Sequence, residues 1–149
     1  RKGDIQSDDQ GLLERYLRPE PRIALGPALI DIASASADIS DGLLADIGHI
    51  CTASDKGAQI FLNKLPISIN VKSLCARYPD YRHFLWAGGD DYEVVFTADV
   101  SKRQQIINLA CDFNTLITRV GHITGENSVL LCDQDGTIID SPHSGYKHF

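Results

Sequence analysis

Two carboxylates and a hydroxyl stand together in the sequence Asp-Ile-Ser-Asp at residues 38–41. Leucine and isoleucine residues follow at helical spacing, which predicts a helix that packs one face on a core. Asp38, Ser40 and Asp41 would then lie at or just before the first turn, where free backbone N–H groups and the helix dipole favour an anion such as phosphate. Carboxylates beside it suit a hard cation such as Mg²⁺. The competing interpretation is that Asp41 only caps the helix.

A second candidate segment is the sequence Gly-Gly-Asp-Asp-Tyr-Glu at residues 88–93. The glycine pair and the two acids lead directly into a β-rich run, which predicts a turn followed by a strand. A purely structural interpretation is that Asp90 and Asp91 simply start this strand after the glycine turn.

Together the two segments resemble the thiamine-monophosphate kinase family, in the superfamily that also holds aminoimidazole-ribonucleotide synthetase and the hydrogenase-maturation and selenophosphate-synthesis proteins. Two further segments match in the same order. Residues 18–22 are similar to the family's Arg-Pro-x-Pro-Arg segment, and residues 145–149 resemble its aromatic C-terminal motif. The resemblance is to the C-terminal domain of the family and covers nearly the whole chain.

The resemblance implies a role for five residues. Asp38 and Asp41 would coordinate magnesium that bridges the nucleotide phosphates, with Asp41 also essential to catalysis, and Ser40 would contact the phosphates of ATP. Asp90 would contact thiamine monophosphate, at a position where relatives usually carry the longer glutamate. Tyr146 would stack on the substrate ring, where relatives often carry tryptophan, and either ring can face a cationic thiazolium.

The implied activity is phosphorylation of thiamine monophosphate to thiamine diphosphate with ATP and Mg²⁺. It would take place between this domain and an N-terminal domain, in a full-length protein that is expected to be a homodimer. Two alternatives stay open: another ATP-dependent enzyme of the superfamily that acts on a different small molecule, and a non-catalytic interaction domain that keeps only the fold.

Composition narrows the remaining function classes. The chain has 149 residues and is 43% hydrophobic, as expected for one ordinary domain. A net charge of -6 without a block of Lys or Arg argues against a nucleic-acid partner. No run approaches the ~20 apolar residues of a membrane span, which favours a cytoplasmic protein. The four cysteines show no C-x-x-C spacing and are expected to be reduced.

The start of the chain predicts that it is a piece of a longer protein, because the sequence contains no Met and begins at Arg1. Residues 1–10 are polar and are expected to be the remainder of a linker, and residues 11–149 the domain itself. His49 is expected to be a surface residue rather than a metal ligand.

Periodicity and turn residues predict alternating helices and strands. Helices are expected over residues 11–17, 26–33, 41–54, 69–78 and 101–113, and strands over 36–39, 58–62, 91–97, 116–123 and 129–132. Gly57 is expected in the left-handed position that ends the third helix, and the last two strands are expected to form a β-hairpin. This order predicts a layered α/β domain with a mixed sheet. The family resemblance specifies the α+β class with a largely antiparallel sheet.

Overall fold

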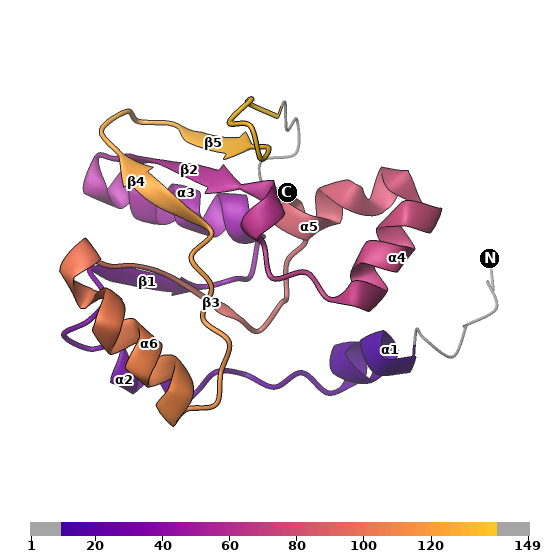
Figure 1. The fold of residues 1–149 in the computed structure, drawn as a ribbon, viewed down its shortest axis with the longest axis horizontal. Coiled ribbons are helices and arrows are strands. Elements are labelled where there is room, and N and C mark those ends of the chain that lie inside the picture. Colours follow the sequence, from indigo (N-terminus) through magenta and orange to yellow (C-terminus); the bar gives the residue numbers. More distant parts are fainter. Residues whose placement is uncertain (1–9, 140–149) are drawn as a thin grey trace.

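The structure, a computed structural model, describes residues 10–139 (Figure 1). Its helices are α1 (Gln10–Leu17), α2 (Leu25–Ala28), α3 (Leu43–Ser54), α4 (Ile69–Arg77), α5 (Phe84–Ala87) and α6 (Arg103–Asp112). Its strands are β1 (Ala35–Asp38), β2 (Gly57–Phe61), β3 (Val94–Thr97), β4 (Gly121–Thr124) and β5 (Val129–Cys132). Short 3₁₀ turns are η2 (Leu62–Lys64), η3 (Pro79–His83) and η4 (Val100–Lys102).

Strands β1 and β3 form a two-stranded antiparallel sheet. The register pairs Asp38 with Val94 at one end and Ala35 with Thr97 at the other. The end of β1 therefore lies beside the start of β3. This pairing brings together the two segments that carry the predicted chemistry, although about 50 residues separate them in the sequence.

The second sheet has three strands in the order β4-β2-β5, with β2 antiparallel to β4 and parallel to β5. The predicted hairpin between β4 and β5 is therefore wrong, because both strands pair with β2 instead. Residues 125–128 cross the start of β2, where a Cβ on Gly57 would lie 1.7 Å from the carbonyl oxygen of Glu126. The α+β class and the mixed, mostly antiparallel pairing are confirmed, but the described strands form two sheets rather than one.

Helix α3 lies at the centre of the larger core cluster. Its buried side chains pack with β2, β3, β5, α5 and Leu65, and the buried members of this cluster are Leu44, Ile47, Cys51, Ala58, Ile60, Leu65, Trp86, Val95 and Leu131. Burial of each large side chain in such a cluster stabilises the fold by roughly 1.5–3 kcal/mol. The helix that follows the Asp38–Asp41 segment is thus firmly anchored.

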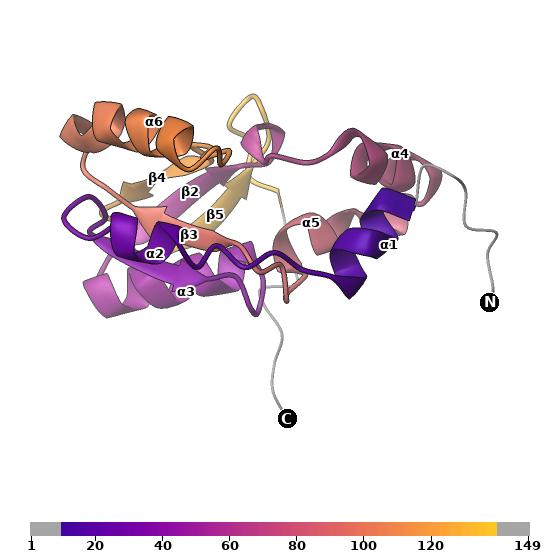
Figure 2. The same ribbon diagram turned by 90° about the horizontal axis from the view of Figure 1, so that it is seen from below.

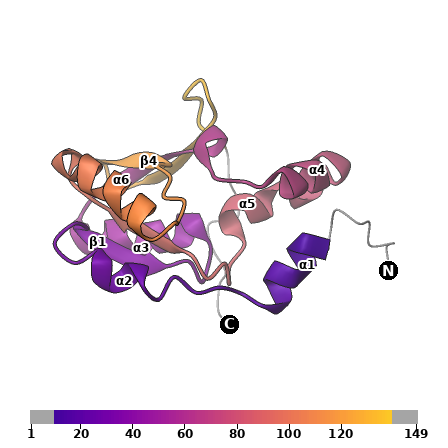
Figure 3. The ribbon, with the colours of Figure 1, turned by 60° about the horizontal axis from the view of Figure 1, so that its bottom comes forward.

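A second, smaller cluster joins α2 to α6 through Leu25, Leu29 and Leu109. Helices α3 and α6 lie on opposite sides of the strands (Figure 2). Helices α1 and α4 project to one side of the strands (Figure 3). Among the described residues, no helix combines the length and the apolar character needed to cross a membrane.

Candidate functional site

The predicted phosphate and metal residues lie in the short connection between β1 and α3. Asp38 is the last residue of β1, Ser40 is exposed and Asp41 is half-buried. The N-cap residue of α3 is Gly42, and no side chain caps the helix from that position. Gly42, and not Asp41, therefore occupies the N-cap position that the competing interpretation gave to Asp41. The phosphate and metal role of this connection stays a prediction.

The segment at residues 88–93 docks on this connection through the backbone. The N–H of Asp90 donates to the carbonyl oxygen of Ser40 at 3.1 Å, and the N–H of Asp91 donates to that of Ile39 at 3.2 Å. The N–H of Ile39 in turn donates to the carbonyl oxygen of Glu93 at 2.9 Å. The structure thus brings Asp38, Ser40, Asp41 and Asp90 to one corner, which we call the β1–α3 corner (residues 38–42 with residues 88–93).

Two glycines make this close approach possible. A Cβ on Gly89 would lie 2.0 Å from the carbonyl oxygen of Ser40. A Cβ on Gly42 would lie 2.8 Å from the backbone of Ala87, and Gly42 has a φ of +107°, which is unfavourable for other residues. Gly89 of the glycine pair therefore serves as a contact surface for the first segment as well as part of a turn.

Asp46 is a site residue that sequence reasoning missed. It lies in the first turn of α3 and is only 4% exposed. Its Oδ2 accepts the backbone N–H of Ser40 at 3.0 Å and that of Asp41 at 3.2 Å. The sequence pattern that could have revealed Asp46 is a charged residue among the apolar positions Leu43, Ile47 and Ile50 of one helix face.

The side chains at the corner include donors that suit a hard cation. Asp41, Asp46 and His49 each offer a ligand atom, and these three atoms lie within 4.8 Å of one another. Magnesium prefers carboxylate oxygens to imidazole nitrogens, so Asp41 fits the predicted ion better than His49 does. Asp38 is exposed at the end of β1, at the rim of the same corner.

An ion-pair cluster ties the N-terminal arm (residues 18–24) to this corner. Arg22 Nε donates to Glu93 Oε2 at 3.0 Å, and Arg22 Nη2 donates to Glu93 Oε1 at 2.9 Å. Arg15 also pairs with Glu93. Partial burial alone would raise the pKa of Glu93, but the hydrogen bonds and charges of Arg22 and Arg15 outweigh it and hold this pKa below the usual value. The arginine that ends the Arg-Pro-x-Pro-Arg match therefore contacts the second segment of the site.

The residues around Asp90 are held in an unusual conformation. Asp90 and Tyr92 have positive φ values of 60° and 56°, which non-glycine residues seldom adopt. Burial raises the pKa of the neighbouring Asp91, and the charges of Glu93 and Asp90 add to the effect while Arg15 opposes it. Local strain and crowded negative charge of this kind often mark functional sites.

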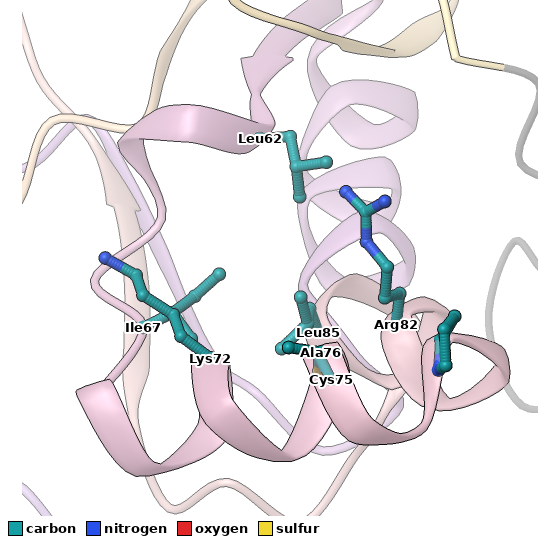
Figure 4. Close-up of a pocket in the computed structure, with 8 residues that line it drawn as sticks. Leu62, Ile67, Lys72, Cys75, Ala76, Arg82 and Leu85 are labelled. Carbon is teal, nitrogen blue, oxygen red and sulfur yellow. The ribbon is translucent and has the colours of Figure 1, made fainter.

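A separate cavity of about 390 Å³ lies between η2, α4, η3 and α5 (Figure 4). Its lining is largely apolar with two cations, and consists of Leu62, Ile67, Lys72, Cys75, Ala76, Pro79, Arg82 and Leu85. None of the residues predicted to carry function lines it. The last predicted site residue, Tyr146, lies outside the described residues.

No protein-family model matches the chain. Among curated proteins, the thiamine-monophosphate kinase of Escherichia coli (strain K12) is 38% identical over 144 residues, which are 95% of this chain and 43% of that protein. The thiamine-monophosphate kinase of Haemophilus influenzae is 35% identical over 154 residues, with 99% of this chain and 46% of that protein covered. The chain is a homologue of the thiamine-monophosphate kinases. It spans less than half the length of these curated relatives.

Solved thiamine-monophosphate kinase structures share the fold. The enzyme from Stenotrophomonas maltophilia K279a superimposes with a TM-score of 0.79 at 39% identity, over 91% of this chain and 42% of that one. The complex of AaThiL with AMPPCP and TMP gives a TM-score of 0.78 at 30% identity, over 99% of this chain and 44% of that one. The hydrogenase maturation protein HypE of Escherichia coli gives 0.63 at 18% identity, which shows a common fold only. The predicted resemblance to thiamine-monophosphate kinases and the predicted fold class are both confirmed.

Proposed function

We propose that the chain is the C-terminal domain of a thiamine-monophosphate kinase, which transfers a phosphoryl group from ATP to thiamine monophosphate and forms thiamine diphosphate. The observation that carries the proposal is the docking of residues 88–93 on residues 38–42. It brings the proposed nucleotide residues and the proposed substrate residue Asp90 to one corner, as the transfer of a group between two ligands requires. The homology to thiamine-monophosphate kinases supports ATP and thiamine monophosphate as the two ligands.

On the nucleotide side, Asp38 and Asp41 would hold magnesium. When bound, the ion supplies charge neutralisation for the phosphates, which is the main requirement of phosphoryl transfer. The N–H groups of Ser40 and Asp41 already donate to Asp46. The contact of Ser40 with a nucleotide phosphate would therefore come from its exposed hydroxyl, which can donate a hydrogen bond.

On the substrate side, the exposed Asp90 would contact thiamine monophosphate. A carboxylate at this place can accept hydrogen bonds from the amino group of the pyrimidine or face the cationic thiazolium. Tyr146 would stack on the substrate ring. The solved relative that holds both AMPPCP and TMP is 30% identical to this chain and supports the assignment of both ligands.

The proposal extends to the whole protein. An N-terminal domain would complete the phosphate and metal shell, residues 1–10 would belong to the linker, and the full-length protein would be a cytoplasmic homodimer. The length of the relatives supports an N-terminal domain, since this chain covers only 43% of the enzyme from Escherichia coli.

The test is an assay of thiamine diphosphate formation by the full-length protein with its Asp41→Asn variant. Loss of a metal ligand removes several kcal/mol of transition-state stabilisation, so kcat should fall by about 10²–10³-fold with little change in melting temperature. Asp112→Asn is the matched control, because Asp112 is an exposed acid at the end of α6, outside the corner. Normal turnover by Asp41→Asn would contradict the proposal.

A ligand screen separates the alternatives. A ligand that binds the folded state raises its melting temperature, and thiamine monophosphate with Mg-ATP should do so. Stabilisation by aminoimidazole nucleotides alone would instead favour another enzyme of the superfamily. No stabilisation by either class would favour an interaction domain.

A further inference from the structure

Asp46 carries a buried carboxylate beside the proposed nucleotide and metal residues. Asp46 is buried in the first turn of α3, the helix whose Leu44 and Ile47 belong to the core cluster. A buried carboxylate is costly unless it is hydrogen-bonded. The carboxylate of Asp46 accepts hydrogen bonds from two backbone groups of the β1–α3 connection, the N–H groups of Ser40 and Asp41. Asp46 therefore links α3 to the β1–α3 connection by hydrogen bonds, in addition to the packing of Ile39 on the core cluster.

The backbone of the β1–α3 connection forms hydrogen bonds on two sides. Its carbonyl groups at Ile39 and Ser40 accept from the N–H groups of Asp91 and Asp90. Its N–H groups at Ser40 and Asp41 donate to Asp46. The first set of bonds fixes the connection to the second segment, and the second set fixes it to α3.

We propose that Asp46 is a positioning residue, whose carboxylate holds the backbone of Ser40 and Asp41 so that their side chains face the ligands, without itself contacting nucleotide or metal. Its consequence for catalysis rests on the proposed function. Although a ligand atom of Asp46 lies near Asp41 and His49, Oδ2 already accepts two N–H groups and the residue is 4% exposed. Asp46 therefore differs from Asp38, which is exposed and can meet a ligand.

Amide hydrogen exchange in the full-length protein tests the hydrogen bonds directly. In Asp46→Ala, both amides lose their acceptor, and their exchange should accelerate by about tenfold or more, the factor that corresponds to one hydrogen bond. In Asp46→Asn, the side-chain oxygen can still accept, so exchange at Ser40 and Asp41 should stay near the parent rate. Unchanged exchange in Asp46→Ala would overturn the proposal.

Asp99→Ala is the matched control for this experiment. The Asp99 carboxylate also accepts a backbone N–H, from Ser101 at 2.8 Å. It lies beyond the Thr97 end of β3, whereas the corner lies at the Val94 end. Its removal should accelerate exchange at Ser101 and leave Ser40 and Asp41 unchanged.

Steady-state kinetics separates positioning from metal binding. Asp46→Asn should keep the Mg²⁺ and ATP requirements of the full-length enzyme within about threefold, because the acceptor remains, whereas Asp46→Ala should raise both by about ten- to a hundredfold. If Asp46 were a metal ligand, Asp46→Asn would weaken Mg²⁺ binding as much as Asp46→Ala does, because both changes remove the carboxylate charge. An equal rise of the Mg²⁺ requirement in Asp46→Asn and Asp46→Ala would overturn the proposal.

If Asp46→Ala does not fold, Asp46→Asn decides alone: parent-like amide exchange with a parent-like Mg²⁺ requirement supports positioning, and a raised Mg²⁺ requirement overturns it. If the parent protein does not phosphorylate thiamine monophosphate, the proposed function fails. The exchange result at Ser40 and Asp41 still decides whether Asp46 holds the connection.

Discussion

Asp46 and three aspartates of the β1–α3 corner, Asp38, Asp41 and Asp90, differ in what their surroundings allow them to do. Asp46 is buried and bonded to the backbone, Asp41 is half-buried, and Asp38 and Asp90 are exposed. Burial and bonding make a carboxylate structural, whereas exposure leaves it able to meet a ligand. The same residue type thus serves the scaffold and the proposed chemistry within one small region.

Asp90→Asn tests the substrate role of the exposed acid. Asn tolerates the left-handed conformation found at residue 90, so this change removes the charge without adding backbone strain. We expect the requirement of the full-length enzyme for thiamine monophosphate to rise about five- to thirtyfold, corresponding to about 1–2 kcal/mol, while the ATP requirement barely changes. Titration of each substrate at saturation of the other measures both, with Asp135→Asn in an exposed turn as the control. An equal effect on ATP would contradict the assignment.

Tyr146→Ala tests the second proposed substrate contact. Loss of a stacking or cation–π contact costs about 1–2 kcal/mol, so the thiamine monophosphate requirement should rise about five- to thirtyfold. Tyr146→Trp should be tolerated, because the larger ring keeps a stacking face. The same pair of titrations measures the effect. An unchanged thiamine monophosphate titration in Tyr146→Ala would remove this residue from the substrate site.

The sequence could predict the grouping of Asp38, Ser40, Asp41 and Asp90, because two motifs in a fixed order resemble those of one family. It missed Asp46 for a physical reason. Periodicity analysis follows apolar positions and assigns charges to the solvent face, whereas Asp46 is a charge on the buried face. Only its two backbone donors explain how such a residue is accommodated.

At the scale of the elements, the contact between Gly89 and the β1–α3 connection should be sensitive to a single methyl group. A Cβ on Gly89 would meet the Ser40 carbonyl oxygen at 2.0 Å. Gly89→Ala should therefore separate the two segments and destabilise the protein by about 1–3 kcal/mol, in the range of other overpacking changes. Gly48→Ala is the matched control in α3, where a Cβ meets nothing within 4 Å, and it should stabilise by about 0.5–1 kcal/mol. Denaturant unfolding measures both, and equal effects would contradict this account.

The ion-pair cluster that ties the N-terminal arm to β3 predicts a pH-dependent stability. The pKa of Glu93 is lowered in the folded protein, so its stabilising contribution is fully present above the unfolded value of about 4.3 and is lost as pH falls through the lower folded value. Glu93 is 36% exposed, and solvent screening limits the expected loss in Glu93→Gln at pH 7 to about 0.5–1 kcal/mol.

Denaturant unfolding across pH checks this prediction. The difference between the parent and Glu93→Gln should be constant from pH 7 to about pH 5 and should shrink below about pH 4. Glu126→Gln is the control, because Glu126 is also a glutamate but lies in the exposed turn before β5. A difference that grows on acidification would contradict the assignment of Glu93 as the ionised partner of the arginines.

The sequence predicted most elements but not how the last strands pair. Strands β4 and β5 are neighbours in sequence, which predicts that they pair with each other. The apolar β2, whose Ala58 and Ile60 are buried, lies between them instead. Gly57 was expected to end α3 in a left-handed conformation. Asp55 takes that conformation with a φ of 52°, and Gly57 is needed because the residues that lead to β5 pass directly over it.

At the scale of the whole molecule, the core explains why a layered domain of helices and strands was predictable from the pattern while the arrangement of the sheets was not. Helix α3 packs against strands of both sheets through one cluster, so the alternation of apolar helices and strands is visible in the sequence. Pairing between distant strands depends on register and close backbone contacts, which single residues such as Gly57 and Gly89 decide.

The openness of the corner leads to a prediction for the chain by itself. Asp38, Ser40 and Asp90 are exposed, and phosphoryl transfer requires that the phosphates be surrounded by charge-neutralising groups and shielded from water. If an N-terminal domain supplies the rest of that shell, the 149-residue chain alone should form no thiamine diphosphate from ATP and thiamine monophosphate. The full-length protein should do so under the same conditions, and its activity should be lost in Asp41→Asn. Measurable turnover by the 149 residues alone would show that the corner is sufficient and would contradict the two-domain account.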